Sequence, residues 1–223
     1  MTKLLPQLNS DLGELADLVR KSLVQVSAGR NGAGSGVIFS SDGLVVTNAH
    51  VVSGKGGRRR TTEFQVTSPS GSVMAAKLLA KDDDLDLAVL KIDQIDGSTP
   101  DLHPIELGNS KALRPGQWVM AMGHPWGVAG AAVAGIVIGA GDDLPDHSSE
   151  GPGGGRDWVV VDLALRPGHS GGPLVDHHGR LIGISTMMAG REVGMAVPAD
   201  VVKEFVDSIL AGGSGLVSTR SRS

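Results

Sequence analysis

The chain contains no cysteine and no tyrosine, and its only aromatic residues are three tryptophans and three phenylalanines. Without cysteine it can form no disulfide, no thiolate metal site and no cysteine nucleophile. The scarcity of aromatic rings disfavours a paratope-like or single-stranded nucleic-acid binder, since both use aromatic platforms. A net charge of −4 provides no basic field that would attract nucleic acid or an anionic membrane.

Long hydrophobic runs are also absent. No run of about 18 apolar residues occurs, so no membrane span is expected. The leucines of the first 25 residues are interrupted by charged residues such as Asp11, Glu14 and Asp17, which a signal peptide would not carry in its apolar stretch. We therefore expect a cytoplasmic location, or an extracytoplasmic one if a targeting segment precedes this chain in the natural protein.

Glycine, by contrast, is abundant. The 33 glycines among 223 residues are about twice the usual share of roughly 7 %, and they are spread between short apolar runs. This distribution indicates many tight turns. The length is enough to bury the core of one large domain or of two small ones.

From residue 23 onward, short β-branched runs are separated by Gly, Asp, Ser and Pro. These runs are Leu23–Val26, Gly36–Phe39, Leu44–Thr47, Leu87–Ile92, Trp118–Met122, Val133–Ile138, Trp158–Val161, Leu181–Ser185 and Val193–Val197. The spacing predicts an antiparallel sandwich or barrel rather than βαβ units. The polar stretch Asp93–Pro115, with three prolines, predicts the link between two β-rich halves, 23–110 and 111–200.

Helices are predicted at the two ends of the chain. In the N-terminal helical segment, 1–22, the pattern predicts a helix from Ser10 to Leu23 that Ser10 caps. Pro198 opens a second helix that extends to residue 212. The Ser/Arg-rich residues 213–223 are expected to form a disordered tail.

One segment, Gly168–Leu174, indicates chemistry. Ser170 is flanked by glycines on a tight turn, which exposes its hydroxyl and lets a substrate carbonyl approach the backbone. The backbone N–H groups of Gly168 and Ser170 can then stabilise an oxyanion. The alternative interpretation is a glycine-rich turn that contains an incidental serine.

A serine nucleophile needs a base, and the base needs a carboxylate that orients it. His50 follows the apolar run Leu44–Thr47, although a histidine in such a place can also be structural. Asp86 directly precedes the apolar run Leu87–Ile92, which draws its side chain inward. The neighbouring acids Asp82, Asp83 and Asp84 read as a solvated loop.

These segments resemble the HtrA/Deg family of chymotrypsin-like serine proteases. The matching pieces are Gly34–Ile38, Gly43–Val52, Asp86–Ile92, Gly123–Gly127, Asp162–Ala164, Gly168–Leu174, Leu181–Ser185 and Gly194–Pro198, which together span about residues 30 to 200. The resemblance implies an all-β fold of two perpendicular six-stranded β-barrels with short terminal helices. It also implies a triad of His50, Asp86 and Ser170 in the cleft between the barrels and an oxyanion hole at Gly168, His169 and Ser170.

The sequence departs from the family pattern in several places. Arg166 and His169 stand where the family usually has asparagine, and we expect the His169 side chain to point away from the triad. Activation by N-terminal cleavage is not expected, because His169 replaces the aspartate that pairs with a new N-terminus in digestive relatives. In the family, loops around the site set activity, and Asp142–Arg156 and Met187–Glu192 stand where those loops are expected.

Two further departures concern partners. The peptide-binding PDZ module of the family does not occur within these residues, and the N-terminal segment lacks the aromatic residues by which relatives form trimers. A homo-oligomer is therefore left open. The expected partners are unfolded or damaged protein substrates, with no nucleic acid.

By alignment with the family, the substrate pocket comprises Ala164, Ile184, Met187 and Met195. None is charged, which implies cleavage after small or medium aliphatic residues. Ordinary core positions are the alternative for these residues. A catalytically silent peptide-binding protein of the same fold is the competing function.

No cofactor and no metal are expected. His177 and His178 are adjacent in a turn and lack an evident third ligand. The segment Gly151–Gly155 resembles a phosphate loop in composition only, because no Gly-Lys-Ser/Thr follows it. The basic run Arg58–Arg60 reads as solvated surface.

Overall fold

The computed structural model describes residues 4–27, 33–53, 63–93, 102–141, 157–190 and 192–212. Its elements are α1 (Leu4–Arg20), β1 (Leu23–Ser27), β2 (Ala33–Ile38), β3 (Leu44–Thr47), α2 (Ala49–Ser53), β4 (Glu63–Thr67), β5 (Val73–Asp82), β6 (Leu87–Ile92), η2 (Ser110–Ala112), β7 (Trp118–Gly123), η3 (Pro125–Gly127), β8 (Ala131–Ala140), β9 (Val159–Asp162), β10 (Pro173–Val175), β11 (Leu181–Gly190), β12 (Val193–Pro198) and α3 (Ala199–Ala211). The predicted loop at 142–156, the basic run at 58–60 and the tail at 213–223 lie outside the described residues.

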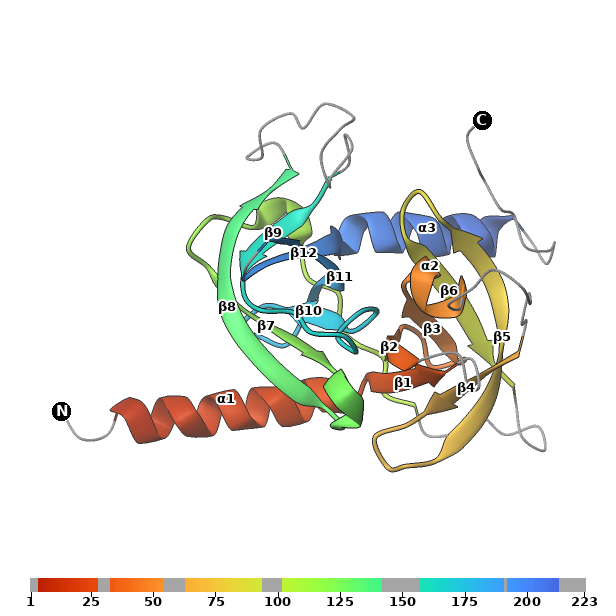
Figure 1. Ribbon diagram of the computed structural model, residues 1–223, viewed down its shortest axis with the longest axis horizontal. Coiled ribbons are helices and arrows are strands. Elements are labelled where there is room, and N and C mark those ends of the chain that lie inside the picture. The colour runs from red at the N-terminus through yellow and green to blue at the C-terminus, as the bar shows by residue number, and fades with distance from the viewer. Residues whose placement is uncertain are drawn as a thin grey trace.

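The strands close into two antiparallel barrels of six strands each, which lie side by side in Figure 1. The first has the order β1-β2-β3-β6-β5-β4, and the second has the order β10-β11-β12-β9-β8-β7. Helix α1 runs beside the second barrel and leads into β1 of the first. The predicted all-β fold of two six-stranded barrels is confirmed.

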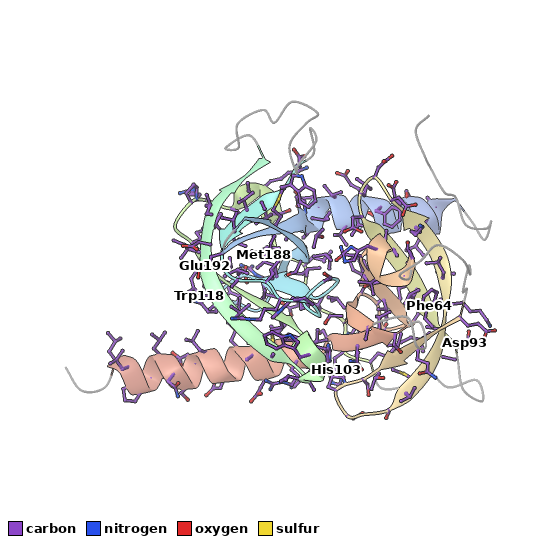
Figure 2. All side chains as sticks on the ribbon, viewed as in Figure 1. Phe64, Asp93, His103, Trp118, Met188 and Glu192 are labelled. Carbon is purple, nitrogen blue, oxygen red and sulfur yellow. The ribbon has the colours of Figure 1, made fainter. Side chains whose placement is uncertain are left out.

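Three hydrophobic clusters stabilise the fold. One fills the first barrel, one fills the second, and the third collects residues from both barrels and from α1 and α3. Strand β3 shows how this works: Val45 belongs to the cluster of the first barrel, whereas its neighbour Val46 belongs to the shared cluster. Because both faces are buried, such a strand reads as a continuous apolar run. Figure 2 shows the side chains, with Phe64 on the first barrel and Met188 on the second.

Three strands, β4, β5 and β10, lie outside the predicted runs. In β4, Phe64 and Val66 are buried while Glu63 and Gln65 are exposed, so only alternate residues are apolar. Strand β5 alternates between exposed and buried residues only from Val73 to Lys77, and it is rich in alanine, leucine and lysine, which favour helices. Strand β10 has only three residues. A search for continuous β-branched runs therefore passes over them.

The terminal helices differ from the prediction at one end only. Helix α1 begins at Leu4, so Ser10 lies inside it, where its hydroxyl donates to the Glu14 carboxylate at 3.3 Å instead of capping the helix. Leu23 is the first residue of β1. Helix α3 follows Pro198 and ends at Ala211, with Gly212 as its C-cap. Among the described residues, no helix is both long and apolar enough to cross a membrane.

The described part of the predicted link is attached to both barrels. The Ile105 N–H donates to the Ile38 carbonyl of β2 at 2.9 Å. On the other side, the Leu181 N–H donates to the Glu106 carbonyl at 2.7 Å, and the Gly108 N–H donates to the Leu181 carbonyl at 2.8 Å. The connection thus fixes β2 of the first barrel relative to β11 of the second.

Candidate active site

The structure brings His50 and Asp86 together. His50 lies in the short helix α2, directly after β3, and Asp86 immediately precedes β6, which pairs with β3. The two carboxylate oxygens of Asp86 lie 3.0 and 2.9 Å from Nδ1 of His50, and the backbone N–H of His50 donates to Oδ1 at 3.0 Å. Because a carboxylate only accepts, Nδ1 of a neutral His50 carries the proton and Nε2 is left as an acceptor.

Asp86 has an unusual backbone conformation, and the Asn48 side chain contacts its carbonyl. Its φ of 53° lies in the left-handed region, which a residue with a Cβ rarely adopts. The buried Asn48 amide donates to the Asp86 carbonyl and to Oγ1 of Thr186, both at 2.9 Å. Asn48 therefore ties the loop of Asp86 to strand β11 of the other barrel.

The neighbouring acids are engaged elsewhere. Oδ1 of Asp82 accepts the Leu85 N–H at 2.8 Å within the turn, and Asp83 forms an ion pair with Lys81 at 2.7 Å. Asp83 is largely exposed, whereas the Asp86 side chain is 13 % exposed. Asp86 is thus the buried carboxylate of this turn and the one that contacts His50.

The turn that carries Ser170 is shaped by the close approach of other backbone segments. A Cβ on Gly171 would lie 2.1 Å from the Ser35 carbonyl oxygen, and one on Gly172 would lie 2.0 Å from that of Met122. Gly171 also has a φ of 81°. Only glycine fits at these two positions, because any side chain would collide with the backbone of one barrel or the other.

The Ser170 hydroxyl donates to the Thr186 carbonyl at 3.1 Å. Among the hydrogen bonds of the described residues, none joins Ser170 to His50. Thr186 also contacts the segment that carries His50, since Asn48, two residues before His50, donates to the Thr186 hydroxyl. Ser170 and Asn48 therefore both contact Thr186 at one junction of the barrels.

The three predicted oxyanion residues differ in what their N–H groups do. The His169 N–H donates to the Arg166 carbonyl at 2.9 Å, so it is used within the turn. The backbone N–H groups of Gly168 and Ser170 donate to no other residue in the described part of the chain. Gly168 has a φ of 108°, and a Cβ there would lie 2.4 Å from the His124 carbonyl oxygen.

Two histidines flank Gly168: His124 is half-buried and His169 is buried. The His169 side chain is 2 % exposed and its Nδ1 lies 3.1 Å from both the N and the O of Arg166, so it faces the turn and not the triad. Burial lowers the pKa of His124 to about 4, with a smaller contribution from the charge of His169. Burial also lowers the pKa of His169. Both rings are neutral at neutral pH.

The four residues predicted to line the substrate pocket differ in how exposed they are. Ile184 and Met195 are 0 % and 4 % exposed and belong to the hydrophobic cluster shared by the barrels. Ala164 is half-buried. The side chain of Met187 lies outside the description. Strand β11 extends to Gly190, so most of the predicted loop Met187–Glu192 is strand.

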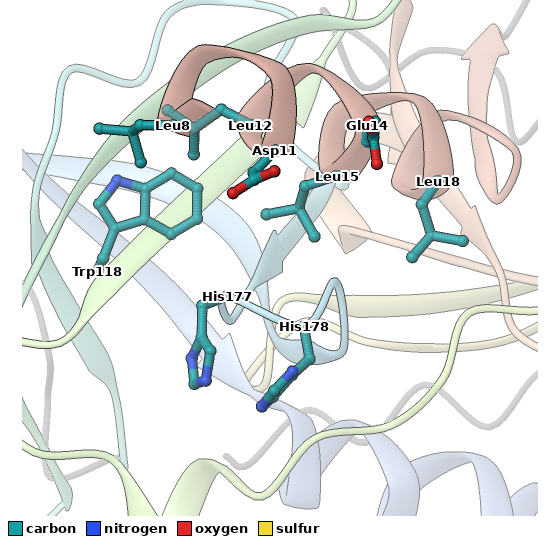
Figure 3. Close-up of a pocket in the computed structure, with 9 residues that line it drawn as sticks. All are labelled: Leu8, Asp11, Leu12, Glu14, Leu15, Leu18, Trp118, His177 and His178. Atoms are coloured by element: carbon teal, nitrogen blue, oxygen red, sulfur yellow. The ribbon is translucent and has the colours of Figure 1, made fainter. Parts of the chain in front are cut away.

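A separate pocket of about 770 Å³ lies beneath α1 (Figure 3). The face of α1 that includes Leu8, Leu12 and Leu15 lines one side, and Trp118 and the pair His177–His178 line the other. None of the predicted catalytic residues borders it. Over the described ranges, no cluster of three metal-ligating side chains occurs.

Four residues that contact these segments were not predicted as site residues from the sequence: Ser35, Asn48, His124 and Thr186. Ser35 and Asn48 lie within segments that match the family, but a serine in a strand or an asparagine just after one has no distinctive signal of its own. Their partners are distant in the chain, so only the folded structure shows what they contact.

Comparisons with known proteins agree with the fold. Residues 34–184 match the family model described as a trypsin-like peptidase domain. Two proteins named "Probable periplasmic serine endoprotease DegP-like", from Bartonella henselae and Rhizobium meliloti, are 36 % and 37 % identical over 185 and 186 residues. Each alignment covers 81 % of this chain and 34 % of the relative, so the chain spans about a third of the length of these relatives.

A solved structure is similar as well. The one titled "HtrA-type protease AlgW with tripeptide" superposes with a TM-score of 0.75 at 30 % sequence identity. The match covers 91 % of this chain and 64 % of the other. The likeness therefore extends over both barrels.

Proposed function

The chain belongs to the HtrA-type family of trypsin-like serine proteases, and on that premise we propose that it is a serine endopeptidase. Ser170 is the nucleophile, His50 the general base and Asp86 the carboxylate that orients His50. The observation that carries the proposal is the pairing of Asp86 with Nδ1 of His50 at 2.9 and 3.0 Å. This pairing leaves Nε2 as the proton acceptor that a serine nucleophile requires.

The reaction begins with a rotation of the Ser170 side chain away from the Thr186 carbonyl and towards Nε2 of His50. As Oγ attacks the peptide carbonyl, its proton passes to Nε2, and an Oγ–C bond forms. The carbonyl oxygen becomes an oxyanion that accepts from the N–H groups of Gly168 and Ser170. The C–N bond then breaks, His50 protonates the leaving amine, and water hydrolyses the acyl-enzyme by the same steps.

We propose unfolded or damaged proteins as substrates, cut after small or medium aliphatic residues. No charged side chain stands at the four positions assigned to the pocket, so nothing there would anchor Lys, Arg, Asp or Glu. Ile184 and Met195 are buried, so they can contact a substrate side chain only if the pocket opens.

An extracytoplasmic location fits this role better than the cytoplasmic one, because the relatives from Bartonella henselae and Rhizobium meliloti are named periplasmic. The competing function, a catalytically silent binding protein, is not favoured, since the base and its carboxylate are paired. It would require the serine to stay turned towards Thr186 permanently.

Degradation of unfolded casein tests the proposal. The wild-type chain should cleave casein, and mass spectrometry of the products should show mainly Val, Ala, Leu or Met before the cut. The Ser170→Ala variant should lose activity by about 10⁴ to 10⁶-fold while its circular dichroism spectrum stays unchanged. A folded Ser170→Ala variant that retains most of the activity would overturn the assignment, and a dominant Arg or Glu before the cut would overturn the apolar pocket.

A further inference from the structure

Ser35 connects the first barrel to the segment that carries the nucleophile. It lies in β2, it is 0 % exposed, and no step of the reaction described above uses it. Its backbone N–H donates to the Ser170 carbonyl at 2.8 Å. Its hydroxyl donates to the Gly168 carbonyl at 2.7 Å. One residue of the first barrel therefore contacts both ends of the segment Gly168–Ser170 in the second, through its hydroxyl at Gly168 and its backbone N–H at Ser170.

The positions of these two carbonyls matter because each belongs to a residue whose N–H group is part of the proposed oxyanion site. Gly168 and Ser170 are the residues whose N–H groups are proposed to receive the oxyanion. Within one residue, the directions of the N–H and the C=O are related by only two torsion angles. Anchoring the carbonyl of each residue therefore restricts the direction of its N–H. Glycine at position 168, with a φ of 108°, would otherwise have the widest conformational freedom of any residue.

The hydrogen bonds of Ser35 leave no group unsatisfied. Its one hydroxyl hydrogen is given to the Gly168 carbonyl, which can only accept. The hydroxyl oxygen then accepts from the His124 backbone N–H at 3.0 Å, and from Nδ1–H of His124 at 3.0 Å. The His124 N–H is shared with the Gly168 carbonyl, also at 3.0 Å. The Ser35 carbonyl accepts from the Thr47 hydroxyl at 2.7 Å.

The backbone around this network is packed so closely that the segment has little room to move. A Cβ on Gly123, at the end of β7, would lie 2.7 Å from Cα of His169 and 2.8 Å from the Gly168 carbonyl oxygen. Because Gly123 has no side chain, the segment Gly168–Ser170 can pack directly against β7. Ser35 contacts the same segment from the first barrel.

We infer that Ser35 is a positioning residue, which holds the backbone of Gly168 and Ser170 in the orientation that receives the oxyanion. The inference rests on the proposed function of the same site. Ser35 does not touch the reacting atoms in this account. Its hydroxyl acts through the Gly168 carbonyl, so removal of the hydroxyl affects the transition state more than the binding of the substrate. The backbone N–H that holds the Ser170 carbonyl stays in place in Ser35→Ala.

The experiment compares Ser35→Ala with a matched control in the full chain. Ser110 is also buried, at 3 % exposed, and its hydroxyl accepts the backbone N–H of Asp200 at 3.1 Å, so Ser110→Ala likewise removes a buried serine hydroxyl, but at the start of α3. The measurements are kcat and KM on an aliphatic peptide substrate, the Ki of a peptide boronate that forms a tetrahedral adduct with serine, the Kd of an uncleaved product peptide, and the Tm.

Ser35→Ala should lower kcat by about 10 to 100-fold with KM changed less than about threefold, because a small misplacement of oxyanion donors weakens only the transition state. The Ki of the boronate should rise by a similar factor, and the Kd of the product peptide should not change. Ser35→Thr, which restores the hydroxyl, should recover kcat. Ser110→Ala should leave kcat and the Ki unchanged, although its Tm falls.

Should Ser35→Ala fail to fold, Ser35→Cys gives the same measurement with a side chain of nearly equal size and a weak donor. Equal kcat and Ki values for the Ser35 and Ser110 variants would overturn the inference while leaving the proposed function intact. A wild-type chain that neither cleaves the peptide nor binds the boronate would overturn the proposed function, and this inference with it.

Discussion

At the scale of single residues, Asp86 and Asp83 provide a matched pair of carboxylates in one turn. Asp86→Asn should lower kcat/KM by about 10⁴-fold at neutral pH, because an amide favours the wrong tautomer of His50. Asp83→Asn removes only an exposed ion pair with Lys81 and should change kcat/KM less than about twofold. Steady-state kinetics on one peptide substrate measure both. An equal loss at Asp83 would show that the wrong carboxylate has been assigned.

His124 predicts a dependence of stability on pH. Burial lowers its pKa to about 4 in the folded protein, whereas an unfolded histidine titrates near 6.5. Between these values the unfolded chain binds the proton and the folded chain does not, so stability is complete above about pH 6.5 and falls as the pH drops towards 4.

The lowered pKa of His124 should contribute about 1–2 kcal/mol to the free energy of unfolding at neutral pH, after allowance for partial solvent screening. Urea unfolding at pH 7 and pH 5 measures it, with His124→Asn as the comparison, since asparagine does not titrate. A free energy of unfolding that falls equally in the two proteins between these pH values would contradict the assignment to His124.

The residue scale also shows which parts of the site a sequence can reveal. Ser170, His50 and Asp86 each stand beside a local signal: a glycine-flanked turn or the end of an apolar run. Ser35 has no such signal, because its role depends on Gly168 and His124, which are 133 and 89 residues away. The burial of Ile184 also depends on how the barrels assemble. From the sequence, Ile184 stands in an apolar run, and such a run can supply either a core residue or a residue that lines a pocket.

At the scale of elements, helix α1 attaches to the body of the protein by its C-terminal half. Val19 is 1 % exposed and lies in the shared cluster, whereas Leu5 is 75 % exposed. Val19→Ala should lower the free energy of unfolding by about 1–3 kcal/mol, and Leu5→Ala by less than about 0.5 kcal/mol. Urea denaturation measures both. A comparable loss for Leu5→Ala would mean that the first turns of α1 are buried in solution.

The elements that the sequence predicts best are those buried on both faces. Strands β3 and β6 appear as apolar runs because one face fills a barrel and the other contacts the shared cluster. Strand β4 is exposed on one face, so only its alternate residues are apolar, and the helix-forming residues of β5 hide the strand pattern there. The start of α1 at Leu4 was missed because a serine inside a helix can look like a cap.

At the scale of the whole molecule, the two barrels share a hydrophobic cluster and the Asn48–Thr186 hydrogen bond. They should therefore unfold together. Thermal melts followed by tryptophan fluorescence, whose three reporters all lie in the second half of the chain, and by far-UV circular dichroism should give one coincident transition. Two separated transitions would contradict a core shared between the barrels.

The central claim is that Ser170 is an activated nucleophile, and reaction with a fluorophosphonate tests it most directly. The wild-type chain should gain the mass of a single phosphonyl group, and peptide mapping should locate the group on Ser170. Ser170→Ala should gain none, and Asp86→Asn should react far more slowly. A folded wild-type chain that stays unmodified, or that carries the group on another residue, would contradict the account.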